Sequence, residues 1–188
     1  MSHYRIHTIE SAPERSRPAL ESLQRAMGLV PNLAATMAES PVLLQGFVGA
    51  FGNFHGGSFS GAEKQVLLLT SAVANACAWA VAFHSTLALK EGVSAADVRA
   101  IRERRPPEDG RLAALSSFAR ALIEKRGQVG EQAVEAFARG GFGRDQVLEV
   151  IAGLAVSMMA NYAGNITQPA LEEPFRAQVW AEQERSDR

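Results

Sequence analysis

The sequence predicts an all-α protein. Apolar residues recur at helical spacing along nearly the whole chain, and Ser, Pro and Gly stand where such helices would begin and end. There is no sustained period-two alternation and no hairpin turn between alternating apolar runs, so strands are not expected. The many alanines suit close contacts between helices. We therefore expect a helical bundle with short connections.

Composition places the chain among ordinary globular proteins. Its 188 residues are 47% hydrophobic and 21% charged, with a formal net charge of -1, which suits one filled core. We expect a single domain over residues 1–188, with an irregular arm at 1–10 and a C-terminal tail at 176–188. The charge balance gives no reason to expect nucleic acid or a membrane as a partner. The start lacks the apolar stretch of a secretory signal and the chain has one cysteine, so we expect a cytoplasmic protein.

The N-terminal part predicts three helices. Residues 11–28 carry apolar residues at helical spacing and end in a glycine, and a short helical turn follows at 31–39. Ser40 as N-cap and Pro41 as the first helical residue predict a helix that continues to His55. Three glycines lie on one side of this helix, and we expect another helix to pack closely against them: Gly46, Gly49 and Gly52.

Capping patterns predict the helices that follow. Ser60 and Glu63 form a capping-box pattern before one helix, and a second helix should run over about 76–91. Ser94 and Asp97 repeat the pattern before a short helix that ends in a charged, proline-containing loop. Two more helices are expected at about 110–126 and 131–138.

The segment 147–164 is the most apolar long stretch. It approaches membrane-spanning length but contains polar residues such as Glu149, so we interpret it as a buried core helix. Buried amides need hydrogen-bond partners. We therefore expect Asn161, Tyr162 and Asn165 either to fix the packing or to line a pocket.

The stretch "NACAWAVAFHS" holds the only cysteine, Cys77, seven residues before His84. On a helix the two lie on one face but roughly 10 Å apart, too far for a direct hydrogen bond. The helix start favours an anion, so we expect some thiolate at Cys77. The alternatives are a small buried hydrophobe at Cys77 and a core histidine bonded to a carbonyl at His84. Trp79 could wall a pocket beside the cysteine.

The span 59–93, "FSGAEKQVLLLTSAVANACAWAVAFHSTLALKEGV", resembles the alkylhydroperoxidase AhpD-like and carboxymuconolactone decarboxylase superfamily. The likeness rests on an acidic helix start, a cysteine at the next helix start, a histidine seven residues on and the "ALKEGV" exit. The stretches "GLVPNL", "SPVLLQGF" and "NYAGNITQPALEEPF" are similar to its peroxidase-related branch, so the resemblance covers most of the chain. It implies an AhpD-like helical bundle and a homo-oligomer with sites near subunit contacts.

The resemblance also implies which residues would act. Redox-active members carry Cys-x-x-Cys, then His, with a Glu on the preceding helix, and here Cys77 and His84 match the first Cys and the His. The second Cys is replaced by Ala80, and the Glu position reads Gln65. Glu63 lies two residues earlier and points roughly 200° around the helix. Without a second thiol, an oxidised Cys77 would need an external thiol reductant.

Three functions remain open at this point. The first is weak, thiol-dependent hydroperoxide reduction through Cys77, an antioxidant activity. The second is a non-enzymatic, oligomeric binding or scaffold relative, suggested by Ala80 and Gln65. The third is a decarboxylase-type enzyme with His84 as acid/base, although such relatives carry carboxylates where this chain has Trp79 and Ala80. The candidate catalytic residues are thus Cys77, His84, Gln65 and Glu63, with a small-molecule substrate.

No cofactor or metal site is expected. His3, His7 and His55 fall in an arm and at a loop, without the spacing of metal ligands. No phosphate-binding or dinucleotide fingerprint appears. The basic run at 102–105 is interpreted as a solvated helix end.

Overall fold

The computed structural model describes residues 4–181, and this part of the chain is helical, without strands. The predicted fold class is therefore confirmed. In chain order the elements are η1 (Glu14–Ser16), α1 (Arg17–Met27), α2 (Asn32–Met37), α3 (Pro41–His55), α4 (Gly61–Ala74), α5 (Ala78–Lys90), α6 (Ala95–Arg102), α7 (Gly110–Glu124), α8 (Glu131–Arg139), α9 (Arg144–Thr167) and η2 (Glu173–Gln178), where η denotes a 3-10 helix.

Local capping sets several helix starts. The Ser40 side chain accepts a hydrogen bond from the backbone N–H of Leu43, the third residue of α3. Ser60 and Glu63 form the predicted capping box at the start of α4, with both reciprocal bonds present. At α6 the Ser94 side chain accepts from the Asp97 N–H, but the Asp97 carboxylate accepts from a backbone N–H in the loop before α7. The pair Ser94 and Asp97 is therefore a simple N-cap and not a capping box.

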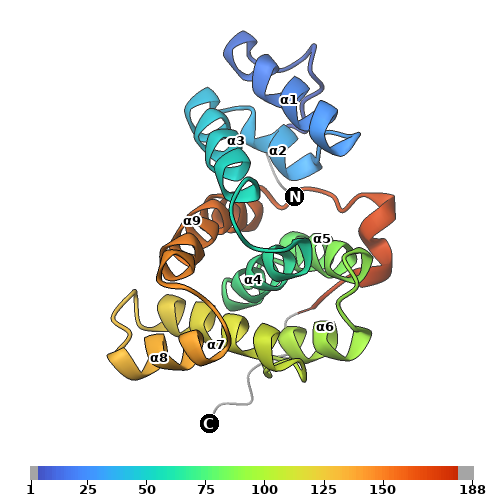
Figure 1. Cartoon of the computed structure of the whole chain (residues 1–188). Helices are drawn as coiled ribbons and strands as arrows, with labels where there is room; N and C mark the ends of the chain where they lie inside the picture. Colours follow the sequence, from blue (N-terminus) through green and yellow to red (C-terminus); the bar gives the residue numbers. More distant parts are fainter. Residues whose placement is uncertain (1–3, 182–188) are drawn as a thin grey trace.

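The helices α4 and α5 form the centre of the molecule (Figure 1). Helix α4 packs against α5, α7 and α9, and nearly all its residues from Glu63 to Val73 are buried. Helices α1 to α3 lie at one end of the molecule in Figure 1, and α6 to α8 lie at the other. The segment around η2 packs on α5. The buried apolar side chains form a cluster that extends from Ala12 to Phe175.

Helix α9 is buried on one side only. The helix packs against α3 and α4, and Val150, Gly153 and Val156 are among its buried residues, whereas other large apolar residues of the helix are exposed. The expectation of a buried core helix over 147–164 thus holds for one face and is wrong for the other. By length and composition alone α9 could cross a membrane, with 44% of its most apolar stretch buried inside the protein.

The glycines of α3 do not serve close packing. A Cβ added at Gly46, Gly49 or Gly52 would meet no atom within 4 Å, so the predicted helix contact at this stripe is absent from the described residues. Helix α3 instead packs against α9 through its other side, which buries Leu44 and Phe54.

Side-chain hydrogen bonds hold both ends of the described chain against the rest of the protein. His7, in the N-terminal arm, bonds to the Glu39 carboxylate at 2.8 Å and to the Ser11 carbonyl at 3.0 Å. Near the C-terminus the Arg102 guanidinium donates to the Gln178 side chain and the Val179 carbonyl. The predicted tail therefore begins in η2. His3 and residues 182–188 lie outside the described residues.

Candidate functional site

The site is centred on His84, which α5 holds against α4. His84 Nδ1 lies 2.9 Å from Gln65 Oε1, and both side chains are buried. Because the amide oxygen can only accept, Nδ1 carries the proton and donates it. The lone pair of the neutral ring is then on Nε2. The structure thus brings together two of the four predicted residues, His84 and Gln65.

Burial keeps this imidazole neutral. Loss of water, with a smaller contribution from the charge of His55, lowers the pKa of His84 to about 3. A histidine with such a pKa is uncharged at neutral pH. His84 can therefore accept a hydrogen bond at Nε2, but it has almost no protonated form with which to donate a proton.

A small apolar cavity adjoins His84. Its volume is about 40 Å³, about three times what one water needs. It lies between the N-terminal helices α1 to α3 and the central helices, and Ala80 forms part of its wall beside His84. Among the described residues, His84 and Ser157 are the only polar side chains that line it apart from the indole of Trp79, and no described cysteine, carboxylate, lysine or arginine does so. The lining residues are Leu23, Met27, Pro31, Leu33, Ala34, Phe47, Phe51, Leu68, Trp79, Ala80, Phe83, His84, Val156, Ser157 and Ala160.

Trp79 is held in place by three contacts. Its ring stacks on Phe83 with centroids 4.9 Å apart and meets Phe175 edge-on. Its Nε1 donates to Glu172 Oε2 at 2.9 Å, and Glu172 Oε1 accepts from the Asn32 N–H. The expectation that Trp79 walls a pocket is confirmed. Glu172 lies 93 positions away, so no local sequence signal could have revealed it.

Cys77 lies at the start of α5 but is not poised for reaction. Helix α5 begins at Ala78, two residues later than predicted, because Ala76 adopts a left-handed conformation with φ of 51°. The thiol is 1% exposed, and burial raises the pKa of Cys77, although backbone N–H groups of Ala80 and Trp79 oppose the rise. The expected thiolate is therefore wrong, and the alternative of a small buried hydrophobe fits better.

Cys77 and His84 do not share a cavity. Cys77 lines a separate surface hollow with Gly164, Asn165 and Gln168. The Cys77 sulfur packs so closely on α9 that a Cβ added at Gly164 would lie 2.8 Å from it. Trp79 lines both the hollow and the His84 cavity and therefore separates them.

Glu63 has a structural role at the start of α4. Its carboxylate accepts from the Ser60 N–H at 2.7 Å and from Arg111 Nε at 2.5 Å. Burial would raise the pKa of Glu63, but these hydrogen bonds outweigh it, and the pKa is lowered. Glu63 does not line the His84 cavity, so it does not replace the carboxylate that redox-active members carry.

The remaining sequence candidates are placed as follows. Asn161 is fully buried and donates to Ser157, while Asn165 Nδ2 donates to the Asn75 carbonyl. Tyr162 is 53% exposed and does not line the His84 cavity, so the expectation that it fixes the packing or lines a pocket is wrong within the described chain. His55 packs on the Phe51 ring with centroids 4.1 Å apart. Within residues 4–181 no three His, Cys, Asp or Glu side chains are grouped to hold a metal ion.

Comparisons with known proteins agree with this architecture. Residues 41–121 match the carboxymuconolactone decarboxylase family. A peroxidase-related protein from Ralstonia eutropha JMP134, described as an alkylhydroperoxidase AhpD core, superposes with a TM-score of 0.80 at 20% identity, over 93% of this chain and 94% of that one. A peroxidase-related protein from Silicibacter sp. TM1040 gives 0.76 at 17% identity, over 94% and 93%.

The debrominase Bmp8 has the same fold. A cysteine-to-alanine variant of Bmp8 in complex with 2,3,4-tribromopyrrole superposes with a TM-score of 0.76 at 20% identity, over 95% of this chain and 97% of that one. No curated protein matches the sequence. The matched segment contains Gln65, Cys77 and His84, and the structural similarity covers 93% to 95% of this chain. Part of the chain, residues 41–121, is therefore similar to the carboxymuconolactone decarboxylase family, and its fold is that of the AhpD-like structures.

Proposed function

We propose that this chain is a non-redox relative of the AhpD-like carboxymuconolactone decarboxylase proteins and that it binds a small, uncharged apolar molecule in the His84 cavity. One observation carries the proposal. The cavity beside Ala80 is lined by apolar side chains with a single titratable group, a histidine whose ring is neutral, and no thiol reaches it. Such a pocket, apolar with a few placed polar atoms, is typical of small-molecule sites.

The position of Cys77 argues against hydroperoxide reduction. The thiolate is the nucleophile in such chemistry. In this chain the thiol is buried, its pKa is raised, and His84 lies in a different cavity. A Cys77 sulfenic acid would also require an outside thiol. One-cysteine peroxidase activity is the first alternative to the proposed binding function.

The pKa of His84 argues against acid/base catalysis. A group is most effective when its pKa lies near the working pH. With a pKa of about 3, only about one ring in ten thousand is protonated at pH 7. No carboxylate lines the cavity to act with it. His84 is therefore better suited to accept a hydrogen bond from a bound molecule than to move protons.

The size of the cavity limits the ligand. A volume of about 40 Å³ is smaller than a cavity that holds benzene, which measures about 150 Å³. A ring-sized ligand must therefore displace flexible side chains, and Met27 in the wall is suited to this. The Bmp8 variant binds a tribrominated pyrrole in the same fold, which supports a one-ring ligand.

Bromine quenching of Trp79 would test the proposal. Trp79 lines the cavity and Trp180 is the only other tryptophan, so Trp180→Phe leaves a single reporter. Titration with 4-bromophenol should quench Trp79 in a saturable manner. Ala80→Phe should abolish saturation because it fills the cavity, while Cys77→Ala should leave it unchanged. Saturation that survives in Ala80→Phe or disappears in Cys77→Ala would contradict the proposal.

A parallel assay addresses the redox alternative. Consumption of hydrogen peroxide and cumene hydroperoxide with dithiothreitol should match the protein-free rate, and Cys77→Ser should not change it. Rapid consumption that requires Cys77 would replace the proposed function with one-cysteine peroxidase activity.

We also propose that the chain forms a homo-oligomer through the exposed face of α9. Five large apolar side chains on this face are 48% to 66% exposed: Leu148, Ile151, Met158, Tyr162 and Ile166. The first three follow coiled-coil-like spacing, so they form a continuous stripe. Burying them would remove on the order of 500 Å² per copy, more than half of the 800 Å² or so that a stable interface needs from each partner.

The mass in solution would test this second proposal. Light scattering should give a multiple of 20.2 kDa for the native chain. The double variant Ile151→Glu and Met158→Glu should give the monomer mass. Val179→Glu changes an equally exposed apolar residue outside α9 and should leave the oligomer intact. A native monomer, or an oligomer in the double variant, would contradict the proposal.

A further inference from the structure

Ser157, on α9, is the second polar group in the wall of the His84 cavity. It is 2% exposed and lies one helical turn before Asn161. Asn161 Nδ2 donates to Ser157 Oγ at 3.1 Å and to Ser71 Oγ at 3.4 Å. The Asn161 amide, which is itself fully buried, therefore occupies a lone pair of the Ser157 hydroxyl.

The proton of the Ser157 hydroxyl has no acceptor among the described residues. Three threonines in these helices donate their hydroxyl protons to the carbonyl four residues earlier. Thr70, Thr86 and Thr167 do so at 2.8 to 3.0 Å. Ser157 makes no such bond, and its one hydrogen bond is the one it accepts from Asn161. A buried hydroxyl that has accepted one bond remains a competent donor.

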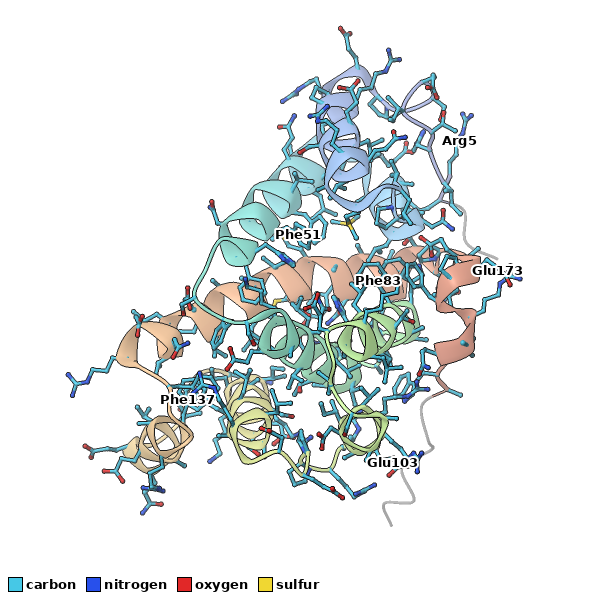
Figure 2. The ribbon with its side chains drawn as sticks, turned by 45° about the vertical axis from the view of Figure 1, so that its right-hand side comes forward. Arg5, Phe51, Phe83, Glu103, Phe137 and Glu173 are labelled. Atoms are coloured by element: carbon cyan, nitrogen blue, oxygen red, sulfur yellow. The ribbon has the colours of Figure 1, made fainter. Side chains whose placement is uncertain are left out.

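The cavity is therefore lined by one side chain that can accept a hydrogen bond and one that can donate it, from two different helices. His84 Nε2 on α5 offers a lone pair, because Gln65 holds the proton at Nδ1. Ser157 on α9 offers a proton. The rest of the wall is apolar and rich in aromatic rings, including Phe51 from α3 and Phe83 from α5, both labelled in Figure 2. Because none of the residues 4–181 places a charged side chain in the wall, an ionic ligand would lose its hydration without compensation there.

We propose that the cavity selects uncharged one-ring molecules that carry both an N–H or O–H donor and a carbonyl-type acceptor. The ligand N–H or O–H donates to His84 Nε2, and its carbonyl oxygen accepts from Ser157 Oγ. This inference rests on the proposed binding function and adds Ser157 as the residue that determines specificity. Asn161 acts as a positioning residue for Ser157.

Four matched probes separate the two contacts. Toluene offers neither group, pyrrole offers a donor, benzaldehyde offers an acceptor, and pyrrole-2-carboxaldehyde offers both. Dissociation constants would be measured by NMR titration, with the indole N–H signal of Trp79 as reporter. Pyrrole-2-carboxaldehyde should bind most tightly to the native chain. A neutral hydrogen bond changes affinity by about three- to tenfold, so Ser157→Ala should weaken the two aldehydes by that factor and leave toluene and pyrrole unchanged.

Two further variants complete the test. Ser157→Thr keeps the hydroxyl and should restore aldehyde binding, which a purely structural role for Ser157 would not predict. His84→Phe should weaken pyrrole and pyrrole-2-carboxaldehyde but not benzaldehyde. Equal losses for all four probes in Ser157→Ala, or no loss for any, would overturn the inference while leaving cavity binding intact. Failure of every probe, toluene included, to bind the native chain would instead overturn the proposed function.

Discussion

Gly164→Ala would place a methyl group against the sulfur of Cys77. The added Cβ would lie 2.8 Å from Sγ, with Leu33 Cδ1 next at 3.5 Å. The first distance is too short for two non-bonded atoms, whereas the second is an ordinary contact. The substitution therefore probes one contact, the one that holds the thiol against α9.

Two effects of opposite sign determine how much Gly164→Ala changes the free energy of unfolding. Crowding in a packed core costs about 1–3 kcal/mol, while Ala is about 1 kcal/mol more favourable than Gly inside a helix. We expect Gly164→Ala to lower the free energy of unfolding by about 0–2 kcal/mol. In a Cys77→Ala background the crowding disappears, so Gly164→Ala should raise the free energy of unfolding by up to about 1 kcal/mol. The coupling between the two sites is then about 1–3 kcal/mol.

Urea unfolding followed by circular dichroism would measure all four members of this double-mutant cycle. Protein concentration should be equal throughout, because self-association stabilises the folded state. Effects of the two substitutions that add within about 0.5 kcal/mol would refute the reasoning. Such additivity would mean that the Cys77 sulfur is free of α9 and accessible for chemistry.

The other predictions concern the imidazole, its aromatic wall and a second helix contact. Because the folded-state pKa of His84 is about 3, the unfolded chain takes up a proton first below pH 6.5. Stability should therefore fall by about 2 kcal/mol from pH 7 to pH 5, and a pH-independent free energy of unfolding, with His84→Phe as reference, would contradict this. Glu172→Gln leaves only one carbonyl oxygen for two donors, one of them Trp79 Nε1. The substitution should therefore weaken ligand binding several-fold and shift the NMR signal of the Trp79 indole N–H. An unchanged signal would contradict the hydrogen bond from Trp79 to Glu172. Gly153→Ala would place a Cβ 2.8 Å from the Phe54 ring and 2.5 Å from a Leu67 methyl. Thermal unfolding should therefore show a larger loss of stability than for Gly164→Ala. An equal or smaller loss of stability would contradict the packing of α9 on α4.

Helix caps that depend on neighbouring residues could be predicted from the sequence. The helix starts at Ser40 and Ser60 were predicted because a cap depends on residues within three positions of each other. The start of α5 was predicted two residues early because the left-handed turn at Ala76 uses a residue type that rarely adopts it. The exposed glycine stripe on α3 was misjudged for a related reason. Spacing shows which residues share a helix face but not what that face meets.

The site was predictable only in part. Gln65 and His84 were found because both belong to one recognisable segment, although their direct hydrogen bond is a tertiary contact. The thiolate at Cys77 was wrong because a helix start lowers a thiol pKa only when burial does not outweigh it. Ser157 is one polar residue within the apolar segment 147–164, and nothing in its local pattern marks it as a site residue. Its place in the cavity wall depends on how α9 packs beside α5, which no short pattern encodes.

A crystal of the native chain grown with 4-bromophenol would test the central claim most directly, because bromine can be located by its anomalous scattering. The binding proposal predicts one bromine peak inside the cavity, between Ala80 and His84, with the phenol hydroxyl within hydrogen-bond distance of Nε2. A bromine peak in the hollow beside Cys77, or a ligand bonded covalently to its sulfur, would contradict the claim that His84 rather than the thiol defines the functional site.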